Sequence, residues 1–294
     1  MSFFGYLING ISLGSVYAII ALGYTMVYGI AKMLNFAHGD VIMVGAFIIY
    51  TAMASLGVSP IVGILMAVVL CTVLGVTIER VAYRPLRNAG SPLAVLITAI
   101  GVSYLLQNLA LLIFGADTKS FSSVVTMKPV SVADGQIMIS GETIVTIIAC
   151  IAIMLALTSF VKYTKAGRAM VAVSEDRGAA QLMGINVNGT IALTFAIGSG
   201  LAAVAGALLC SAYPALSPYV GSMPGIKAFV AAVFGGIGSI PGAMIGGILL
   251  GVIENLSKAY ISSQLSDAIV FSVLIIVLLV RPTGILGKNI QEKV

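Results

Sequence analysis

The sequence predicts an all-α fold, a polytopic bundle of membrane helices, from its composition and from the form of its apolar runs. Of 294 residues, 60% are hydrophobic and only 9% are charged, and the mean hydropathy is +1.13. In soluble domains about a quarter of the residues are charged. Lipid requires that backbone polar groups be satisfied internally, which leaves helices or a closed barrel. The apolar runs are continuous and lack the period-two alternation of barrel strands, so helices are favoured.

Nine apolar segments account for most of the chain. A spanning helix needs roughly 20 residues at a rise of about 1.5 Å each, and the runs of about that length are residues 4–31, 60–82, 92–114, 143–161 and 191–213. The shorter runs are residues 41–56, 226–240, 241–256 and 267–280. Residues 41–56 would reach only about 24 Å of a hydrocarbon core of about 30 Å. We therefore expect about eight to nine segments, some of them short, interrupted helices, in a single transmembrane domain that covers residues 1–294.

Short basic loops predict the orientation of these segments. Lys and Arg cluster after three of the segments, and the positive-inside rule places such loops in the cytoplasm. The clusters are Arg80, Arg84 and Arg87; Lys162, Lys165 and Arg168; and Arg281, Lys288 and Lys293. With residues 115–142 outside, the N-terminus lies outside and the chain crosses nine times. There is no basic residue before Lys32, so the start is expected to be a first membrane helix rather than a cleaved signal.

Two proline-led segments end in similar sequences. Pro60 leads to LGVTIER, residues 74–80, and Pro241 leads to LGVIEN, residues 250–255. The predicted orientation makes the two copies run in opposite directions, which is the pattern of an inverted-topology repeat. In such repeats, short or interrupted helices at corresponding positions indicate the central site. The alignment pairs NFAHGD, residues 35–40, with YPALSPYVGSMPG, residues 213–225.

These paired polar stretches are the candidate pathway, and two interpretations fit the first of them. NFAHGD is a plain loop if Asn35 ends one helix, Asp40 caps the next and His38 lies at the headgroups. It is a helix break lining a translocation path if its polar groups lie at membrane depth, facing protein or water. Both could hold. The candidate pathway and helix-break residues are Asn35, His38, Gly39 and Asp40 in the first stretch and Tyr213, Pro218, Gly221 and Pro224 in the second.

Other unusual residues give no sign of catalysis or of a metal site. The chain has one histidine and contains no HExxH motif, no GxSG motif and no cysteine–histidine cluster, so neither an enzyme nor a metal site is expected. Its three cysteines lie in apolar runs and are expected to be buried packing thiols. Glu79 and Glu254 are either proton-relay groups or, at the ends of their segments, interfacial anchors. The glycine-rich residues 234–251 lack a phosphate-loop signature and are expected to pack helices closely.

Residues 162–189 form the only sizeable polar segment on the predicted cytoplasmic side. Residue types that favour the ends of a short helix occur in it: Ser174 as a cap, Glu175 and Asp176 in the first turn, and Gly184 as the stop. Ala179, Leu182 and Met183 then share one face of that helix. A small amphipathic helix with an apolar face suits the groove of a partner protein. The alternative is an ordinary connector folded on the bilayer surface.

Five stretches of the sequence are similar to one known family. They are NGISLGSVYAIIALGYTMVYGIAKMLNFAHGD, IERVAYRPLR, GRAMVAVSEDRGAAQLMGINV, MPGIKAFVAAVFGGIGSIPGAMIGGILLGVIEN and RPTGILG. Together they resemble the permease subunit of branched-chain amino-acid ABC importers, the LivH type, over nearly the whole chain. The resemblance implies that the coupling segment of the family maps onto Glu175, Asp176, Ala179, Ala180, Gly184 and Ile185. Asp176 stands where the related Glu-Ala-Ala…Gly loop has its first alanine.

The same resemblance implies a multi-pass permease of the bacterial inner membrane that binds no cofactor itself. The expected partners are a second, related permease, two cytoplasmic ATPase subunits that bind ATP and Mg, and a periplasmic or lipid-anchored amino-acid binding protein. The expected activity is import of branched-chain or other hydrophobic amino acids by alternating access. No nucleic-acid partner is expected, because the net charge of +5 is explained by membrane orientation. The alternatives are an ion-coupled secondary transporter or channel for a small neutral solute, and an ABC permease for urea or short amides.

Overall fold

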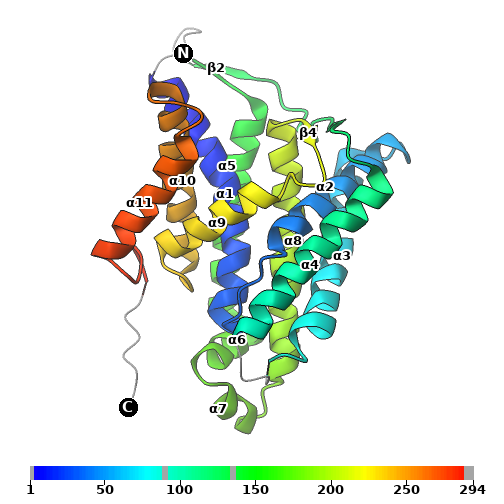
Figure 1. The fold of residues 1–294 in the computed structure, drawn as a ribbon, viewed down its shortest axis with the longest axis vertical. Coiled ribbons are helices and arrows are strands. Elements are labelled where there is room, and N and C mark those ends of the chain that lie inside the picture. The colour runs from blue at the N-terminus through cyan, green and yellow to red at the C-terminus, as the bar shows by residue number, and fades with distance from the viewer. Residues whose placement is uncertain (1–2, 88–91, 133–136, 288–294) are drawn as a thin grey trace.

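The computed structural model describes residues 3–87, 92–132 and 137–287, and within these ranges nine apolar helices form the bundle (Figure 1). They are α1 (Phe3–Ala31), α2 (His38–Ala54), α3 (Pro60–Ile78), α4 (Pro92–Phe114), α5 (Gly141–Tyr163), α8 (Val187–Ala212), α9 (Ser222–Gly235), α10 (Ile240–Tyr260) and α11 (Ser266–Val280). Each helix overlaps a predicted segment, so the all-α polytopic fold is confirmed. Lys288 and Lys293, which contributed to the predicted orientation, lie outside the described residues.

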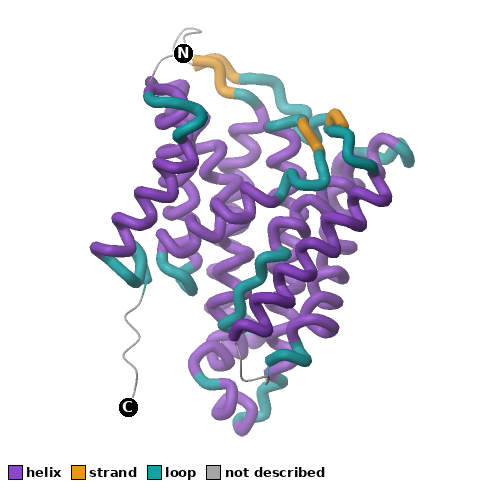
Figure 2. The backbone as a smooth tube through the Cα atoms, in the orientation of Figure 1, coloured by secondary structure: helices purple, strands orange, loops and turns teal. Residues whose placement is uncertain are grey.

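The remaining elements are short and lie at the two ends of the bundle (Figure 2). A π-helix, η1 (Glu79–Tyr83), continues α3, and two small helices, α6 (Lys165–Glu175) and α7 (Arg177–Leu182), connect α5 to α8. At the other end, two antiparallel strand pairs are formed by β1 (Lys119–Ser120) with β4 (Ala215–Leu216) and by β2 (Val130–Val132) with β3 (Ile137–Ile139).

Six of the helices are long and apolar enough to cross a membrane: α1, α3 with η1, α4, α5, α8 and α10. The helices α2, α9 and α11 are shorter. Both α2 and α9 begin inside the bundle, and the chain before each one enters the bundle without helical structure (Figure 1). In the part of the chain that is described, six helices are thus long enough to cross in full, and nine crossings of the chain stay a prediction. At two places the chain returns through the bundle as a non-helical segment followed by a short helix.

The two ends of the bundle segregate as the predicted orientation requires. The N-terminus and the strands lie at one end, whereas α6, α7 and the end of α1 lie at the other (Figure 1). The basic residues after α3 and α5 therefore share the end that carries the 162–189 loop.

The helices pack as an inverted repeat around α1 and α8. α1 lies along α10, and α8 lies along α3 in the corresponding way. Corresponding glycines make both contacts close. A Cβ atom on Gly251 of α10 would lie 2.2 Å from the backbone nitrogen of Gly14, and one on Gly75 of α3 would lie 2.9 Å from the carbonyl oxygen of Phe195. These two glycines occupy the matching positions of LGVIEN and LGVTIER, so the predicted repeat corresponds to a repeated packing contact.

Burial separates the interior of the bundle from its outer surface. Most side chains of α1 and α8 are buried, whereas few of those of α4 and α5 are. The exposed side chains on α4 include large apolar ones such as Leu112 and Ile113. An apolar outer surface is what lipid tails require of a spanning helix. Polar groups in the interior therefore need a separate explanation.

Candidate functional site

The two predicted helix breaks meet inside the bundle. Gly39 lies in the first turn of α2, and it contacts Gly221 and Gly225 at the start of α9 with no side chain between the backbones. A Cβ atom on Gly221 would lie 1.8 Å from the carbonyl oxygen of Gly39, and one on Gly225 would lie 2.9 Å from its Cα. Any larger residue would push the two short helices apart, so glycine is required here. The crossing of α2 and α9 joins the two halves of the inverted repeat.

The first break is a non-helical segment rather than a helix-to-helix turn. Lys32 has a left-handed backbone conformation with φ of 53°, and α2 begins only at His38, with Ala37 at its N-cap position. The expectation that Asn35 ends one helix is wrong, because the chain leaves the helical conformation at Lys32. The expectation that Asp40 caps the next helix is also wrong, because Asp40 lies inside the first turn of α2.

Asn35 and His38 are packed into the core of the bundle. Asn35 is 3% exposed, and its Oδ1 accepts a hydrogen bond of 3.0 Å from the Tyr83 hydroxyl of η1. His38 is 1% exposed, and its ring lies edge-on to Tyr24 with the ring centres 4.6 Å apart. A Cβ atom on Gly23 would lie 2.6 Å from His38 Nε2, so the imidazole fits into a notch on α1. Placement of His38 at the headgroups is therefore wrong.

Asp40 lies where α2, α4 and α9 meet, and it is 2% exposed. Gln107 Nε2 donates a hydrogen bond of 2.8 Å to Asp40 Oδ1, and the same nitrogen lies 3.3 Å from Ser103 Oγ and 3.5 Å from Ser222 Oγ. These groups line a cavity of about 210 Å³, whose other walls are mostly aromatic or aliphatic. Because Ser103 is midway along α4, the cavity lies near the middle of the bundle. We call it the crossing cavity.

The second break contributes to a different cavity. Tyr213 follows the end of α8 and Pro224 lies in the first turn of α9, and both line a cavity of about 230 Å³ together with Lys227 and Glu254. Pro218 is buried in the turn before α9. None of these three candidate pathway residues lines the crossing cavity. The structure therefore brings the two breaks into contact but does not place all the candidate residues along one path.

Glu79 is fully buried at the start of η1. Its charge partners are close in the sequence, five and eight residues later. Arg84 Nη2 lies 3.2 Å from its carboxylate, and Arg87 forms a second ion pair with it. Arg87 also donates a hydrogen bond of 2.6 Å to Asn188 Oδ1 in the first turn of α8. This group of side chains connects the C-terminal end of α3, which lies at the same end of the bundle as α7, to the start of α8.

Glu254 is 1% exposed on α10 and draws its partners from several helices. Lys227 of α9 lies 2.8 Å from its carboxylate and 2.7 Å from that of Asp267 on α11. Lys258 forms a further ion pair with Glu254, and the Tyr17 hydroxyl of α1 donates to it at 2.9 Å. Glu79 and Glu254 are both buried and paired with cations, so their carboxylates act within the bundle, and their role as interfacial anchors or proton-relay groups stays a prediction.

The 162–189 loop contains the predicted short helix, but its boundaries differ from the prediction. Asp176 is the N-cap of α7, and its Oδ1 accepts a hydrogen bond of 3.0 Å from the Ala179 amide. Ser174, the expected cap, belongs to α6, where its hydroxyl donates to the Val171 carbonyl instead. The extended backbone of Asp176 separates the two helices. Gly184 follows α7 with a φ of +80°, which is the predicted stop.

α7 presents an apolar surface at the tip of the molecule (Figure 1). Leu182 is 90% exposed and Met183 is 81% exposed, and Ala179 is exposed beside them. Ala180, by contrast, is 4% exposed, and Ile185 packs against the core. The predicted apolar face therefore exists, and its largest side chains point away from the bundle.

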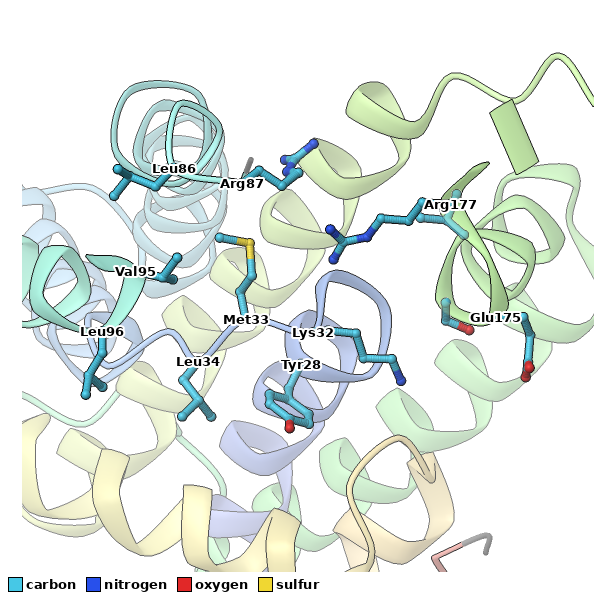
Figure 3. Close-up of a pocket in the computed structure, with 12 residues that line it drawn as sticks. Tyr28, Lys32, Met33, Leu34, Leu86, Arg87, Val95, Leu96, Glu175 and Arg177 are labelled. Atoms are coloured by element: carbon cyan, nitrogen blue, oxygen red, sulfur yellow. The ribbon is translucent and has the colours of Figure 1, made fainter. Parts of the chain in front are cut away.

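A cavity of about 740 Å³ lies between this loop and the first break (Figure 3). Its walls include Lys32 and Met33 from the break and Glu175 and Arg177 from the loop. Figure 3 shows Arg177 extending toward the Met33 segment, while Glu175 points away from it. The guanidinium of Arg177 also binds the carbonyl oxygen of Ala31, the last residue of α1. The first residue of α7 is thus tied directly to the point where the first break begins.

Three residues of these sites were missed by the sequence analysis. Lys227 is a lone cation within an apolar segment, and an intramembrane charge of that kind is a sign of a functional or paired group. Ser103 and Gln107 are four residues apart in an apolar helix, which puts both on one face. That polar face was the available signal for the crossing cavity.

The described residues contain no group of three or more His, Cys, Asp or Glu side chains that could hold a metal ion. Cys71, Cys150 and Cys210 are free and buried, in agreement with the expected packing role.

Short helices that start inside a bundle and meet there are typical of proteins that carry solutes across membranes. The fold and the site define a multi-pass membrane permease. The chain belongs to the family of branched-chain amino acid transport system permease components, which it matches over residues 6–278.

The similarity to individual relatives extends over the full chain. The chain is 48% identical to the high-affinity branched-chain amino acid transport system permease protein LivH of Salmonella typhimurium, over 97% of this chain and 96% of the relative. It is 46% identical to the corresponding protein BraD of Pseudomonas aeruginosa, over 98% and 97% of the two chains. Among solved structures, PsaBC from Streptococcus pneumoniae in complex with Fab matches 96% of this chain and 94% of that chain, with a TM-score of 0.50 and 16% identity. That likeness concerns the fold alone. From its family and the LivH and BraD relatives, the chain is a permease subunit of a transport system and not an enzyme.

Proposed function

We propose that this chain moves branched-chain or other hydrophobic amino acids across the bacterial inner membrane into the cytoplasm, as one half of an ATP-driven importer. The relatives that match it over almost their whole length are named for branched-chain amino acid transport. The observation that carries the coupling part of the proposal is the exposed apolar tip of α7, where Leu182 is 90% and Met183 81% exposed.

The proposed partners supply what the sequence lacks. There is no GxxxxGK[ST] motif for nucleotide phosphates, so ATP and Mg are bound by two cytoplasmic ATPase subunits. A second, related permease completes the path, and a periplasmic or lipid-anchored binding protein delivers the amino acid. The segment Ser174, Glu175, Asp176, Ala179, Ala180, Leu182, Met183, Gly184 and Ile185 is the proposed contact with an ATPase subunit.

The route from α7 to the helix breaks supports this assignment. A displaced α7 would pull on the end of α1 through Arg177 and Ala31. The non-helical segment that starts at Lys32 then leads to Gly39 and its contact with Gly221. Such a movement of one repeat against the other is how alternating access operates in repeat-built transporters. In this mechanism the crossing of α2 and α9 opens to alternate sides.

The test is to replace Glu175 with Arg and Leu182 with Asp and to measure co-purification with the ATPase subunits. An apolar side chain that is buried in an interface contributes about 1.5–3 kcal/mol, and an aspartate in its place leaves a desolvated charge. We expect the variant to be folded and membrane-inserted but to lose both the ATPase subunits and leucine uptake. Gln264→Asp provides a control for the second substitution, because it adds one negative charge, as Leu182→Asp does, at an exposed position between α10 and α11.

If the double variant keeps its ATPase subunits and takes up leucine normally, the docking assignment is wrong. If proteoliposomes of this chain alone accumulate a small neutral solute on a proton or sodium gradient, the ATP-driven proposal is wrong as a whole. Uptake of urea or acetamide in place of leucine by the complete transporter would revise only the substrate.

A further inference from the structure

Among the residues that the structure describes, three carboxylates are almost fully buried, and they differ in their partners. Glu79 and Glu254 each form ion pairs with two cations. Asp40 is equally buried but forms no ion pair with any described residue. Its side-chain partners are neutral, namely the amide of Gln107 and the hydroxyl of Ser103. A buried carboxylate without a cation is costly unless a ligand supplies the missing charge.

The surroundings of Asp40 provide room for such a ligand. Asp40 lines the crossing cavity, whereas Glu79 lines none of the cavities described above and Glu254 is already neutralised by its lysines. The cavity of about 210 Å³ is smaller than the range of about 300–1,000 Å³ typical of drug-sized ligands, so it suits a molecule as small as one amino acid. Gln107 and Ser222 add neutral polar groups, and Phe36 and Ile226 add apolar wall.

We infer that Asp40 receives the ammonium group of the amino acid in transit, with Gln107 and Ser222 as polar neighbours and the apolar wall against its aliphatic side chain. A primary ammonium is a compact cation with three hydrogen-bond donors, which matches a carboxylate whose side-chain partners are all neutral. The position is also where movement would change the site, because α2 supplies Asp40, α4 supplies Gln107 and α9 supplies Ser222. A shift of α9 against α2 therefore alters the pocket that holds the ammonium. This inference rests on the proposed function, since it requires an amino-acid substrate.

The test uses the complete transporter in proteoliposomes and measures L-leucine imported per ATP hydrolysed. Asp40→Asn keeps the size and the hydrogen bond to Gln107 but removes the charge. We expect it to lower leucine per ATP by about ten- to hundredfold, which is the effect of losing one charged hydrogen bond. ATP hydrolysis and the melting temperature are expected to stay near wild type, and Asp40→Glu is expected to restore part of the import. Asp117→Asn is the matched control, because it makes the same change at an exposed residue.

Each other result counts against the inference. Wild-type import by Asp40→Asn would show that no ammonium depends on this carboxylate. A joint loss of import, ATP hydrolysis and melting temperature that Asp40→Glu does not repair would show that Asp40 only holds the fold. If the wild-type complex hydrolyses ATP but imports no leucine, the proposed function fails first and this inference fails with it.

Discussion

The two halves of the inverted repeat both contain a buried glutamate, and the halves use it differently. Glu79 on the first half is neutralised by Arg84 and Arg87, which lie in the turn that directly follows η1. Glu254 on the second half is neutralised in part by Lys227, which belongs to the short helix α9. The two glutamates, which lie four residues after Gly75 and three residues after Gly251, therefore support different connections.

The difference indicates which end of the molecule is held and which is adjustable. The Glu79 group joins α3 to α8 beside the 162–189 loop, through Arg87 and Asn188, so it stiffens the end that receives α7. The Glu254 group ties α9 to α10 and α11 and has no comparable link on the α2 side, where Asp40 has no ion pair among the described residues. We conclude that α9 is fastened by charge, whereas α2 is positioned by the glycine contact at the crossing.

The largest predicted effect follows from removing the charge that fastens α9. Glu254→Gln leaves Lys227, at 7% side-chain exposure, with the partly exposed carboxylate of Asp267 as its remaining charge partner. Loss of one partner of a buried ion pair costs about 3–5 kcal/mol. We expect a large drop in melting temperature and little leucine uptake. A thiol-reactive dye can follow unfolding in detergent, because the chain has no tryptophan and its three cysteines are buried.

A double variant separates the effect of leaving the Lys227 charge without Glu254 from the effect of changing the packing at residue 254. Replacing both Lys227 and Glu254, as Lys227→Met with Glu254→Leu, removes the buried pair together, and such replacements are often neutral. Asp267 and Lys258 are 44% and 39% exposed in their side chains, so water can solvate them. The double variant is expected to melt well above Glu254→Gln. A double variant as unstable as the single one would show that the ion pair itself is not what matters.

The next effect tests the contact that positions α2. Gly221→Ala places a methyl group 1.8 Å from the Gly39 carbonyl oxygen, where only backbone can move. Overpacking of a tight contact costs about 1–3 kcal/mol, and we expect a value near the upper end together with impaired uptake. Gly101→Ala is the control, because an added Cβ on that helical glycine of α4 meets no atom within 4 Å and alanine favours helix. Equal tolerance of both changes would remove the crossing from the mechanism.

The nine segments, the inverted repeat and the two breaks could be predicted from the sequence because each rests on local features. Apolar runs give the helices, and their lengths and prolines identify the short ones, α2 and α9. The Leu-Gly-Val repeats at residues 74 and 250 gave the pairing of the halves, and the structure places their glycines in equivalent helix contacts.

The partners of the buried charges could not be predicted in the same way. Gln107 reaches Asp40 across 67 positions of the chain, and Lys227 reaches Glu254 across 27. Such pairs depend on how helices rotate against one another, which composition and periodicity do not fix. The caps were misassigned for a local reason. Ser174 and Asp40 have the right side chains for a cap, but the N-cap positions of α7 and α2 fall at Asp176 and Ala37 instead.

A smaller effect is expected for the glutamate of the first half. Glu79→Gln leaves Arg84 at 37% side-chain exposure, where water can solvate it. Arg87 is 8% exposed and keeps its hydrogen bond to Asn188, and the new glutamine can still accept a hydrogen bond from it. The loss should therefore be close to that of charged hydrogen bonds, about 1.5–3 kcal/mol, and below that of Glu254→Gln. The same dye assay compares the two variants. If Glu79→Gln proves the more destabilising, the contrast between a local and an inter-helix charge group is wrong.

The smallest effect is expected at the only histidine. His38 packs against Tyr24 and the notch at Gly23, and its Nε2 has no hydrogen-bond partner among the residues that the structure describes. Packing therefore holds the ring without a charge partner. His38→Gln fills a similar volume and should cost less than about 1.5 kcal/mol, with substantial leucine uptake retained. Uptake by the variant and by wild type should keep a constant ratio between about pH 6 and pH 8, the range in which an ordinary histidine titrates. A ratio that falls steadily across that range would show that His38 changes protonation during transport. The first break would then carry a proton-linked step that the second break, which has no histidine, cannot match.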